Sequence, residues 1–160
     1  MKTEHLLIMR FTALGEVAML VPVVSSLAQQ YPELRITVLS NPFARSLFDG
    51  IAHNVGFMAA DLNGEYHGVK GLNALYRRLV AKNFTAIADM QSILRSSYLR
   101  MRFNISSYRV EHLDNHRQER RKLVAAKDKC LKQLPSLFDD YLDVLARLGY
   151  NVSLDFQSLF

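Results

Sequence analysis

The chain has 160 residues, of which 49% are hydrophobic, and a mean hydropathy of −0.01, values that suit one globular domain with a substantial core. No apolar run reaches the ~20 residues that a membrane span needs, and the single cysteine, Cys130, excludes an internal disulfide. The N-terminus lacks the long apolar region of a signal peptide, so we expect a cytoplasmic protein.

The net charge of +5 is unevenly distributed along the chain. Residues 91–135 contain eleven Lys or Arg residues and four acids, whereas the remainder is mildly acidic. Such a segment indicates an anionic partner, which is a nucleic acid, an anionic membrane or a phosphorylated ligand. It is equally typical of a solvated helix face, and charge alone leaves both interpretations open.

The first forty residues predict a βαβ unit. Residues 5–11 form a compact apolar run typical of a buried parallel strand, and a short turn follows over 12–15. Apolar residues recur at helical spacing over 17–28, where Pro22 should kink the helix or lie in its first turns. Residues 35–39 predict the next strand, joined to the first by a right-handed connection.

The alternation continues to the end of the chain. A short helix is predicted over 41–48, a third strand over 54–59, and a long mobile loop over the Gly-rich residues 61–71. Further strands are predicted over 84–90 and 107–113, with helices over 72–82, 93–103, 117–134 and 137–148. This order predicts an α/β fold, Rossmann-like and doubly wound, with a mainly parallel sheet.

The last eleven residues suggest a boundary between domains. After Gly149 the chain begins an extended apolar segment that ends at Phe160. We therefore expect one Rossmann-like domain over 1–150 and, over 151–160, the start of a linker to a C-terminal domain.

Chemistry is expected first at the turn after the first strand, because open α/β sheets bind ligands at the carboxyl ends of their strands. This turn matches neither the GxGxxG dinucleotide fingerprint nor a phosphate-binding P-loop. It carries a carboxylate, Glu16, at the start of a helix. That carboxylate either takes part in chemistry or only complements the helix dipole, which is worth up to ~1 kcal/mol.

A metal site is not expected. His112 and His116 are four residues apart and would share one face if the segment were helical, as metal ligands do. No cysteine, glutamate or third histidine supports them at a familiar spacing.

Several segments together resemble family 9 glycosyltransferases. Residues 7–24, LIMRFTALGEVAMLVPVV, are similar to the opening signature of that family, in which a strand leads into Ser-x-Leu/Met-Gly-Asp and a helix with an early proline. The likeness continues over 61–64 (DLNG), the 68–71 loop, 88–96 (ADMQSILRS) and 113–123 (LDNHRQERRKL). These segments look most like the heptosyltransferase branch, and they cover only the N-terminal half of such an enzyme.

The resemblance implies a fold and an activity. Members have a GT-B architecture in which the N-terminal domain holds the acceptor and the C-terminal domain holds the nucleotide-sugar. The implied reaction is inverting transfer of heptose from ADP-heptose to the lipopolysaccharide inner core, at the cytoplasmic face of the inner membrane, without metal or cofactor. The general base of the family maps onto Glu16, although the family usually has Asp there.

The resemblance also indicates residues for a phosphorylated acceptor, since Arg and Lys hold phosphate by charge-assisted hydrogen bonds. The family's Asp-Lys-Gly-Arg is Asp114-Asn115-His116-Arg117 here, so the usual lysine is absent. The expected acceptor-binding residues are Thr12, Gly15, Lys70, Arg95, Arg117, Arg120, Arg121 and Lys122.

The alternative to a glycosyltransferase is a basic α/β module that binds nucleic acid or another phosphorylated ligand. Its support is Tyr98, Phe103 and Tyr108, which are interleaved with arginines. Against it, the sequence shows no RNP, KH or helix-turn-helix signature.

Overall fold

A computed structural model of the chain describes residues 4–12, 14–91, 93–105, 109–113 and 133–153. Its centre is a five-stranded sheet in which every neighbouring pair is parallel. The strand order is β3-β2-β1-β4-β5, the order of a Rossmann-type sheet. The strands are β1 (His5–Met9), β2 (Arg35–Ser40), β3 (Val55–Ala59), β4 (Ala86–Asp89) and β5 (Arg109–His112).

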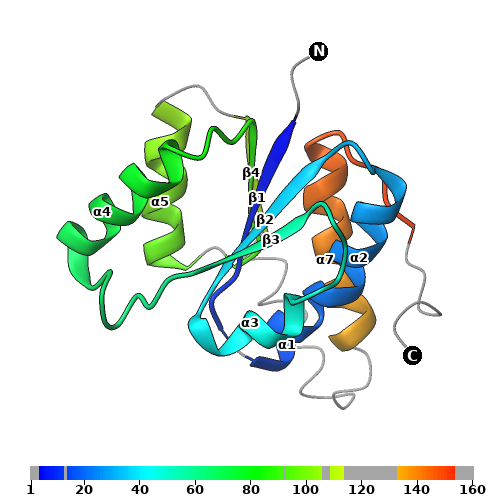
Figure 1. Cartoon of the computed structure of the whole chain (residues 1–160), viewed down its shortest axis with the longest axis horizontal. Coiled ribbons are helices and arrows are strands. Elements are labelled where there is room, and N and C mark those ends of the chain that lie inside the picture. The colour runs from blue at the N-terminus through cyan, green and yellow to red at the C-terminus, as the bar shows by residue number, and fades with distance from the viewer. Residues whose placement is uncertain (1–3, 13, 92, 106–108, 114–132, 154–160) are drawn as a thin grey trace.

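Helices cover both faces of the sheet. In Figure 1, α2 and α7 lie on one face with α1 and α3 near their lower end, and α4 and α5 lie on the other face. The predicted doubly wound α/β architecture is therefore confirmed. The helices are α1 (Leu14–Ala18), α2 (Leu20–Gln30), the 3-10 turn η1 (Pro42–Ala44), α3 (Arg45–Phe48), α4 (Gly68–Val80), α5 (Leu94–Ile105) and α7 (Gln133–Arg147).

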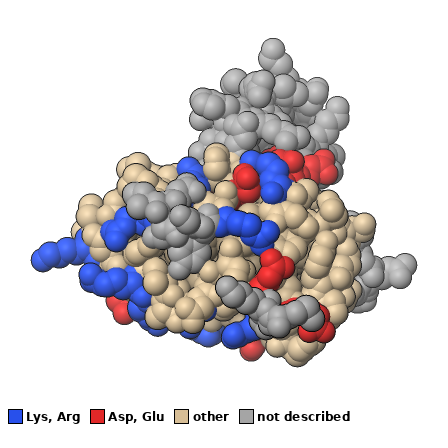
Figure 2. Space-filling view, turned by 90° about the horizontal axis from the view of Figure 1, so that it is seen from above, with Lys and Arg blue, Asp and Glu red and all other residues tan. Residues whose placement is uncertain are grey.

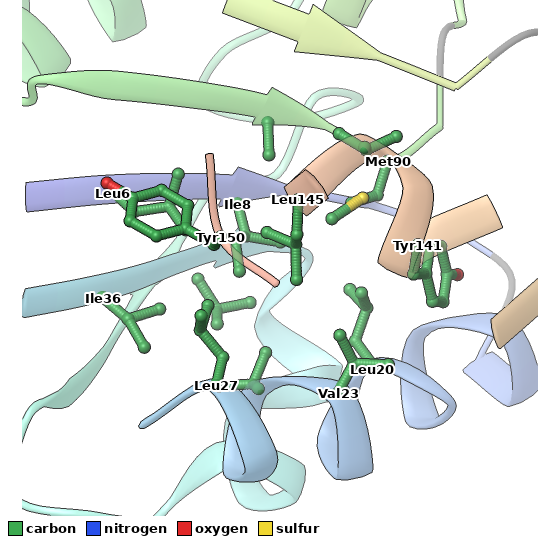
Figure 3. Close-up of a cluster of buried hydrophobic side chains, with 14 of the residues drawn as sticks. Leu6, Ile8, Leu20, Val23, Leu27, Ile36, Met90, Tyr141, Leu145 and Tyr150 are labelled. Atoms are coloured by element: carbon green, nitrogen blue, oxygen red, sulfur yellow. The ribbon is translucent and has the colours of Figure 1, made fainter. Parts of the chain in front are cut away.

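Strand β1 divides the core into two layers because successive side chains of a strand point to opposite faces. All five of its residues are buried. Leu6 and Ile8 pack with α2 and α7, as Figure 3 shows, whereas Leu7 and Met9 pack with α4 and α5. A continuous apolar run is what a strand with helices on both faces requires.

The helix predicted over 17–28 is interrupted near its start. Helix α1 ends at Ala18, Met19 follows, and α2 begins at Leu20. Pro22 is the third residue of α2, where it has no N–H to donate and its ring excludes the carbonyl group four residues earlier. The expected effect of Pro22 is thus observed as a break between two helices.

The loop predicted over 61–71 is too long. Helix α4 begins at Gly68, so residues 68–71 are helical rather than part of a loop. A Cβ atom at Gly71 would lie 2.1 Å from the carbonyl carbon of Tyr66, a distance that no real side chain tolerates. The glycine here permits close packing of helix against turn, and the sequence pattern did not separate this use from loop formation.

The last third of the chain is described in part. The basic helix predicted over 117–134 falls almost entirely in 114–132, outside the described residues, whereas the amphipathic helix is observed as α7 and begins four residues earlier than expected. Residues 151–153 have no regular structure, and the rest of the expected linker lies outside the described residues. Within the described ranges, no helix is long and apolar enough to cross a membrane.

Candidate active site at the carboxyl ends of β1 and β4

The candidate site lies where the order of the strands reverses. From β1 the chain continues outward through β2 and β3, whereas β4 and β5 extend the sheet on the other side. In open α/β sheets this switch point opens a crevice outside the carboxyl ends of the two central strands. Residues 10–16 follow β1 here, and Met90 and Gln91 follow β4.

The side chain of Gln91 holds the turn after β1 in place. Its Oε1 accepts hydrogen bonds from the backbone N–H groups of Phe11 at 2.7 Å and Thr12 at 3.3 Å. Its Nε2 donates to the Thr12 hydroxyl oxygen at 2.7 Å. Gln91 is itself buried and oriented by a backbone bond from its N–H to Asp89 Oδ1 at 3.1 Å. The turn is therefore fixed by a residue eighty positions further along the chain.

Arg10 is a buried cation at the centre of the site. Its Nη1 donates to the carbonyl oxygen of Met90 at 2.6 Å, and its Nε donates to that of Thr12 at 3.0 Å. Its Nη2 forms an ion pair with the Glu16 carboxylate. Its guanidinium also lies 5.8 Å from the centre of the Tyr141 ring. Arg10 thus joins the end of β4, the first turn and α1.

Glu16 lies in the first turn of α1 and remains accessible. Its side chain is 44% exposed, whereas that of its partner Arg10 is 6% exposed. The Tyr141 hydroxyl donates to the backbone carbonyl of Glu16 at 2.8 Å. Burial raises the pKa of Tyr141 far above its ordinary value, so this hydroxyl stays protonated and remains a donor. Both the backbone and the carboxylate of Glu16 are therefore held, and the carboxylate faces solvent.

A second ion pair lies beneath this site. Asp89 at the end of β4 is fully buried, and its Oδ2 is 3.3 Å from Arg100 Nη1 on α5. Its other oxygen accepts the N–H of Gln91. Asp89 therefore connects α5 to the residue that holds the first turn.

The structure brings four of the predicted acceptor-binding residues to this edge. Thr12 and Gly15 are exposed in the first turn and in α1. Lys70 is exposed in the first turn of α4, not in a mobile loop as expected. Arg95 begins α5 and donates to the Leu62 carbonyl at 3.1 Å and to Asn63 Oδ1 at 2.9 Å. The remaining four lie outside the described residues: Arg117, Arg120, Arg121 and Lys122.

Arg10, Gln91 and Tyr141 were not predicted as site residues. For Arg10 a signal existed, because a charged residue in a buried apolar run requires a partner. Gln91 lies within the 88–96 segment that carried the family resemblance, but nothing local showed that its amide meets the first turn. Tyr141 carried only the signal of a core residue.

The structure describes one member of the histidine pair that was considered for a metal. His112 is in strand β5 rather than a helix, and its Nδ1 lies 2.8 Å from the carbonyl oxygen of Leu113. His116 lies outside the described residues. Within the described ranges, no three potential metal ligands gather in one place.

Comparisons with known proteins place this geometry in a structural context. No family model and no curated protein matches the chain. A family 9 glycosyl transferase from Veillonella parvula DSM 2008 matches with a TM-score of 0.65 at 18% identity, over 97% of this chain and 46% of the other. The chain therefore shares the fold of part of this glycosyl transferase.

Two further solved structures of transferases share this fold. The E. coli heptosyltransferase WaaC with ADP matches with a TM-score of 0.60 at 16% identity, over 93% of this chain and 48% of that one. A ugt transferase from Siraitia grosvenorii in complex with UDP matches with a TM-score of 0.50 at 11% identity, over 69% of this chain and 27% of that one. The chain spans about half the length of the two glycosyltransferases described first. The predicted Rossmann-like fold is thus shared with about half of each of these two chains.

Proposed function

We propose that the chain is the acceptor-binding half of an inverting heptosyltransferase. The reaction is transfer of heptose from ADP-heptose to the phosphorylated inner core of lipopolysaccharide at the inner face of the inner membrane. One observation carries the proposal: an exposed carboxylate, Glu16, is held at the switch point of a glycosyltransferase fold. The donor belongs to a second domain, so the chain by itself binds acceptor and transfers nothing.

Glu16 serves as the general base in this mechanism. It takes the proton of the acceptor hydroxyl while the hydroxyl oxygen bonds to the anomeric carbon of the heptose. The bond from that carbon to the diphosphate breaks, ADP leaves, and the configuration inverts. A positioned base contributes roughly 10²–10⁴-fold to such a step. Glu is one methylene longer than the Asp usual in the family. The position of the Glu16 carboxylate therefore depends on the ion pair with Arg10 and on the hydrogen bond from the Tyr141 hydroxyl to the Glu16 backbone.

The surrounding side chains position the base and the acceptor. Arg10 and Tyr141 fix the carboxylate and the backbone of Glu16. Lys70 and Arg95 are the predicted acceptor-binding cations that the structure describes, and phosphate groups of the acceptor would accept hydrogen bonds from them.

The test separates acceptor binding from chemistry. Transfer is measured in a longer protein that joins the chain to its donor-binding domain, with Glu16→Gln and with Glu33→Gln as control. Glu33 is an equally charged, exposed residue before β2, at the opposite edge of the sheet. We expect Glu16→Gln to lower kcat at least ~100-fold and to leave the Kd of a phosphorylated core oligosaccharide unchanged, whereas Glu33→Gln changes neither.

Two results would contradict the proposal. Full turnover by Glu16→Gln would leave that carboxylate only the role of complementing the helix dipole. Displacement of the bound core oligosaccharide by a short single-stranded oligonucleotide of similar affinity would instead favour the nucleic-acid module.

A further inference from the structure

Helices α4 and α5 make one side of the molecule strongly basic. Residues 68–105 contain seven Lys or Arg residues and a single acid, Asp89. That acid is buried and paired with Arg100, so it contributes no negative charge at the surface. In Figure 2 blue side chains lie along the left side, where Figure 1 places α4 and α5, and further blue side chains lie nearer the centre, where red ones are interspersed. The nearest acids in sequence are Glu65, in the turn before α4, and Glu111 in β5, whose carboxylate is paired with Arg147.

The cations of α4 face outward. The buried residues of this helix include Leu72, Leu75 and Leu79, which pack on the sheet. Lys70 and Arg77 are exposed and seven positions apart, which places them on one side of the helix. Lys82, just beyond the helix, is also exposed. Their charges therefore project away from the sheet.

Large apolar side chains are exposed beside these cations. Val69 is 62% exposed, Leu94 is 89% exposed and Met101 is 49% exposed. They are three of the five large hydrophobic residues that are exposed in the described part of the chain. Leu94 and Met101 are seven positions apart on α5 and so share one side of that helix.

Hydrogen bonds connect the two helices at this surface. The Oδ1 atom of Asn73 on α4 accepts from the Tyr98 hydroxyl at 2.8 Å and from Arg102 Nη1 at 2.6 Å, both on α5. The Arg102 guanidinium also lies over the Tyr76 ring at 4.5 Å from its centre. By helical spacing, Lys70 and Arg77 lie on the side of α4 that carries Asn73. Leu94 and Met101 lie on the side of α5 that carries Tyr98, so the two sets adjoin.

We propose that this α4–α5 surface, made by Val69, Lys70, Arg77, Lys82, Leu94 and Met101, binds the headgroup region of an anionic lipid bilayer. Lys and Arg side chains are attracted to anionic headgroups, and neighbouring apolar side chains enter the boundary between headgroups and acyl chains. A nucleic acid would use the cations but would give no role to Leu94, which is the most exposed large apolar residue in the described part of the chain. The membrane is chosen over a nucleic acid for that reason.

This inference names the surface for the membrane contact of the proposed function, but its test is independent of transfer. Binding of the chain to vesicles is measured by flotation, with neither donor nor acceptor present. The vesicles are pure phosphatidylcholine, or phosphatidylcholine and phosphatidylglycerol in a two-to-one ratio. Failure of vesicle binding would leave the role of Glu16 untouched, and inactivity of the enzyme would leave vesicle binding untouched.

The variants are chosen so that the fold is preserved. Lys70→Gln, Arg77→Gln and Lys82→Gln are combined, and Arg78 is left intact because it donates to the Tyr66 hydroxyl. Removing a cation near an anionic membrane weakens binding about fivefold, so the triple variant should lose on the order of 100-fold. Leu94→Ser should lose about tenfold. Circular dichroism and thermal melting confirm that each variant is folded.

Matched controls lie away from this surface. Arg45→Gln removes an exposed arginine at the start of α3 and is compared with Arg77→Gln alone. Phe43→Ser removes a 46% exposed apolar side chain in η1 and is compared with Leu94→Ser. We expect both controls to bind anionic vesicles as the unaltered chain does.

Three results would overturn the proposal. The first is no binding to anionic vesicles by the unaltered chain. The second is equal weakening by the controls and the surface variants. The third is tight binding of a single-stranded oligonucleotide that depends on the three cations but not on Leu94, together with weak vesicle binding.

Discussion

Replacing Arg10 by Met tests whether this buried cation holds the candidate site together. Met fills part of the same volume but donates no hydrogen bond, so the Met90 carbonyl oxygen loses its 2.6 Å partner in a buried position. An unsatisfied buried acceptor costs about 1–3 kcal/mol. The Thr12 carbonyl is near solvent, and the 44% exposed Glu16 carboxylate is hydrated, so their loss adds at most ~1 kcal/mol. We therefore expect Arg10→Met to destabilise the chain by about 1–4 kcal/mol.

The assay is urea unfolding followed by circular dichroism, with thermal melting as a second measure. For a chain of this size, 3 kcal/mol corresponds to a fall in Tm of about 6–12 °C. The matched control is Glu16→Gln, which removes the same ion pair from its exposed side. It leaves every bond from Arg10 to a carbonyl oxygen in place, so it should cost less than ~1 kcal/mol.

The difference in unfolding free energy between Arg10→Met and Glu16→Gln tests whether the bonds from Arg10 to the carbonyl groups stabilise the fold. If Arg10→Met costs no more than Glu16→Gln at an unchanged urea dependence, the bonds to Met90 and Thr12 contribute nothing, and the argument that Arg10 joins β4 to α1 is refuted. A reduced urea dependence in Arg10→Met would instead indicate a more open native state, so m is reported together with the midpoint.

Two further predictions concern packing and pH. In urea unfolding, Gly71→Ala should destabilise the chain by about 2 kcal/mol or more, because the new Cβ atom would overlap the Tyr66 backbone. The control Gly15→Ala should be neutral or stabilising, because a Cβ atom there would meet nothing within 4 Å. Equal effects of the two substitutions would contradict the close packing at Gly71. Burial lowers the pKa of His5 below its ordinary value of 6.5, so the folded state binds the proton less readily than the unfolded state. The free energy of unfolding should therefore keep its full value above pH 6.5 and fall as the pH drops below 6.5. His5→Gln should reduce this dependence of the unfolding free energy on pH. An unchanged dependence would show that other groups cause it.

The fold was predictable because local patterns and the sheet agree. Alternation of apolar strands and amphipathic helices specified an α/β sheet, and Pro22 specified an interruption of the first helix. The predicted loop over 61–71 was wrong in its second half because a glycine serves both flexible loops and close contacts. Only the position of the Tyr66 backbone shows that Gly71 belongs to the second class.

Only the part of the candidate site whose residues are neighbours in the sequence could be predicted. Glu16 could be found because it directly follows a strand whose carboxyl end is a ligand-binding position in this class of fold. Arg10, which holds the Glu16 carboxylate, is itself fixed by the Met90 carbonyl group 80 residues away, and Tyr141, which holds the Glu16 backbone, is 125 residues away. No periodicity within a short window reports contacts at such distances along the chain.

The hydrogen bonds of Gln91 have a consequence for the order in which the chain takes shape during synthesis. The first strand, α2 and β2 leave the ribosome early, but the two N–H groups of the first turn receive their acceptor only when residue 91 has emerged. Until then the turn that precedes Glu16 has no partner for these donors and stays open to water. Completion of the candidate site therefore awaits the synthesis of residue 91, although its central carboxylate, Glu16, is made before it.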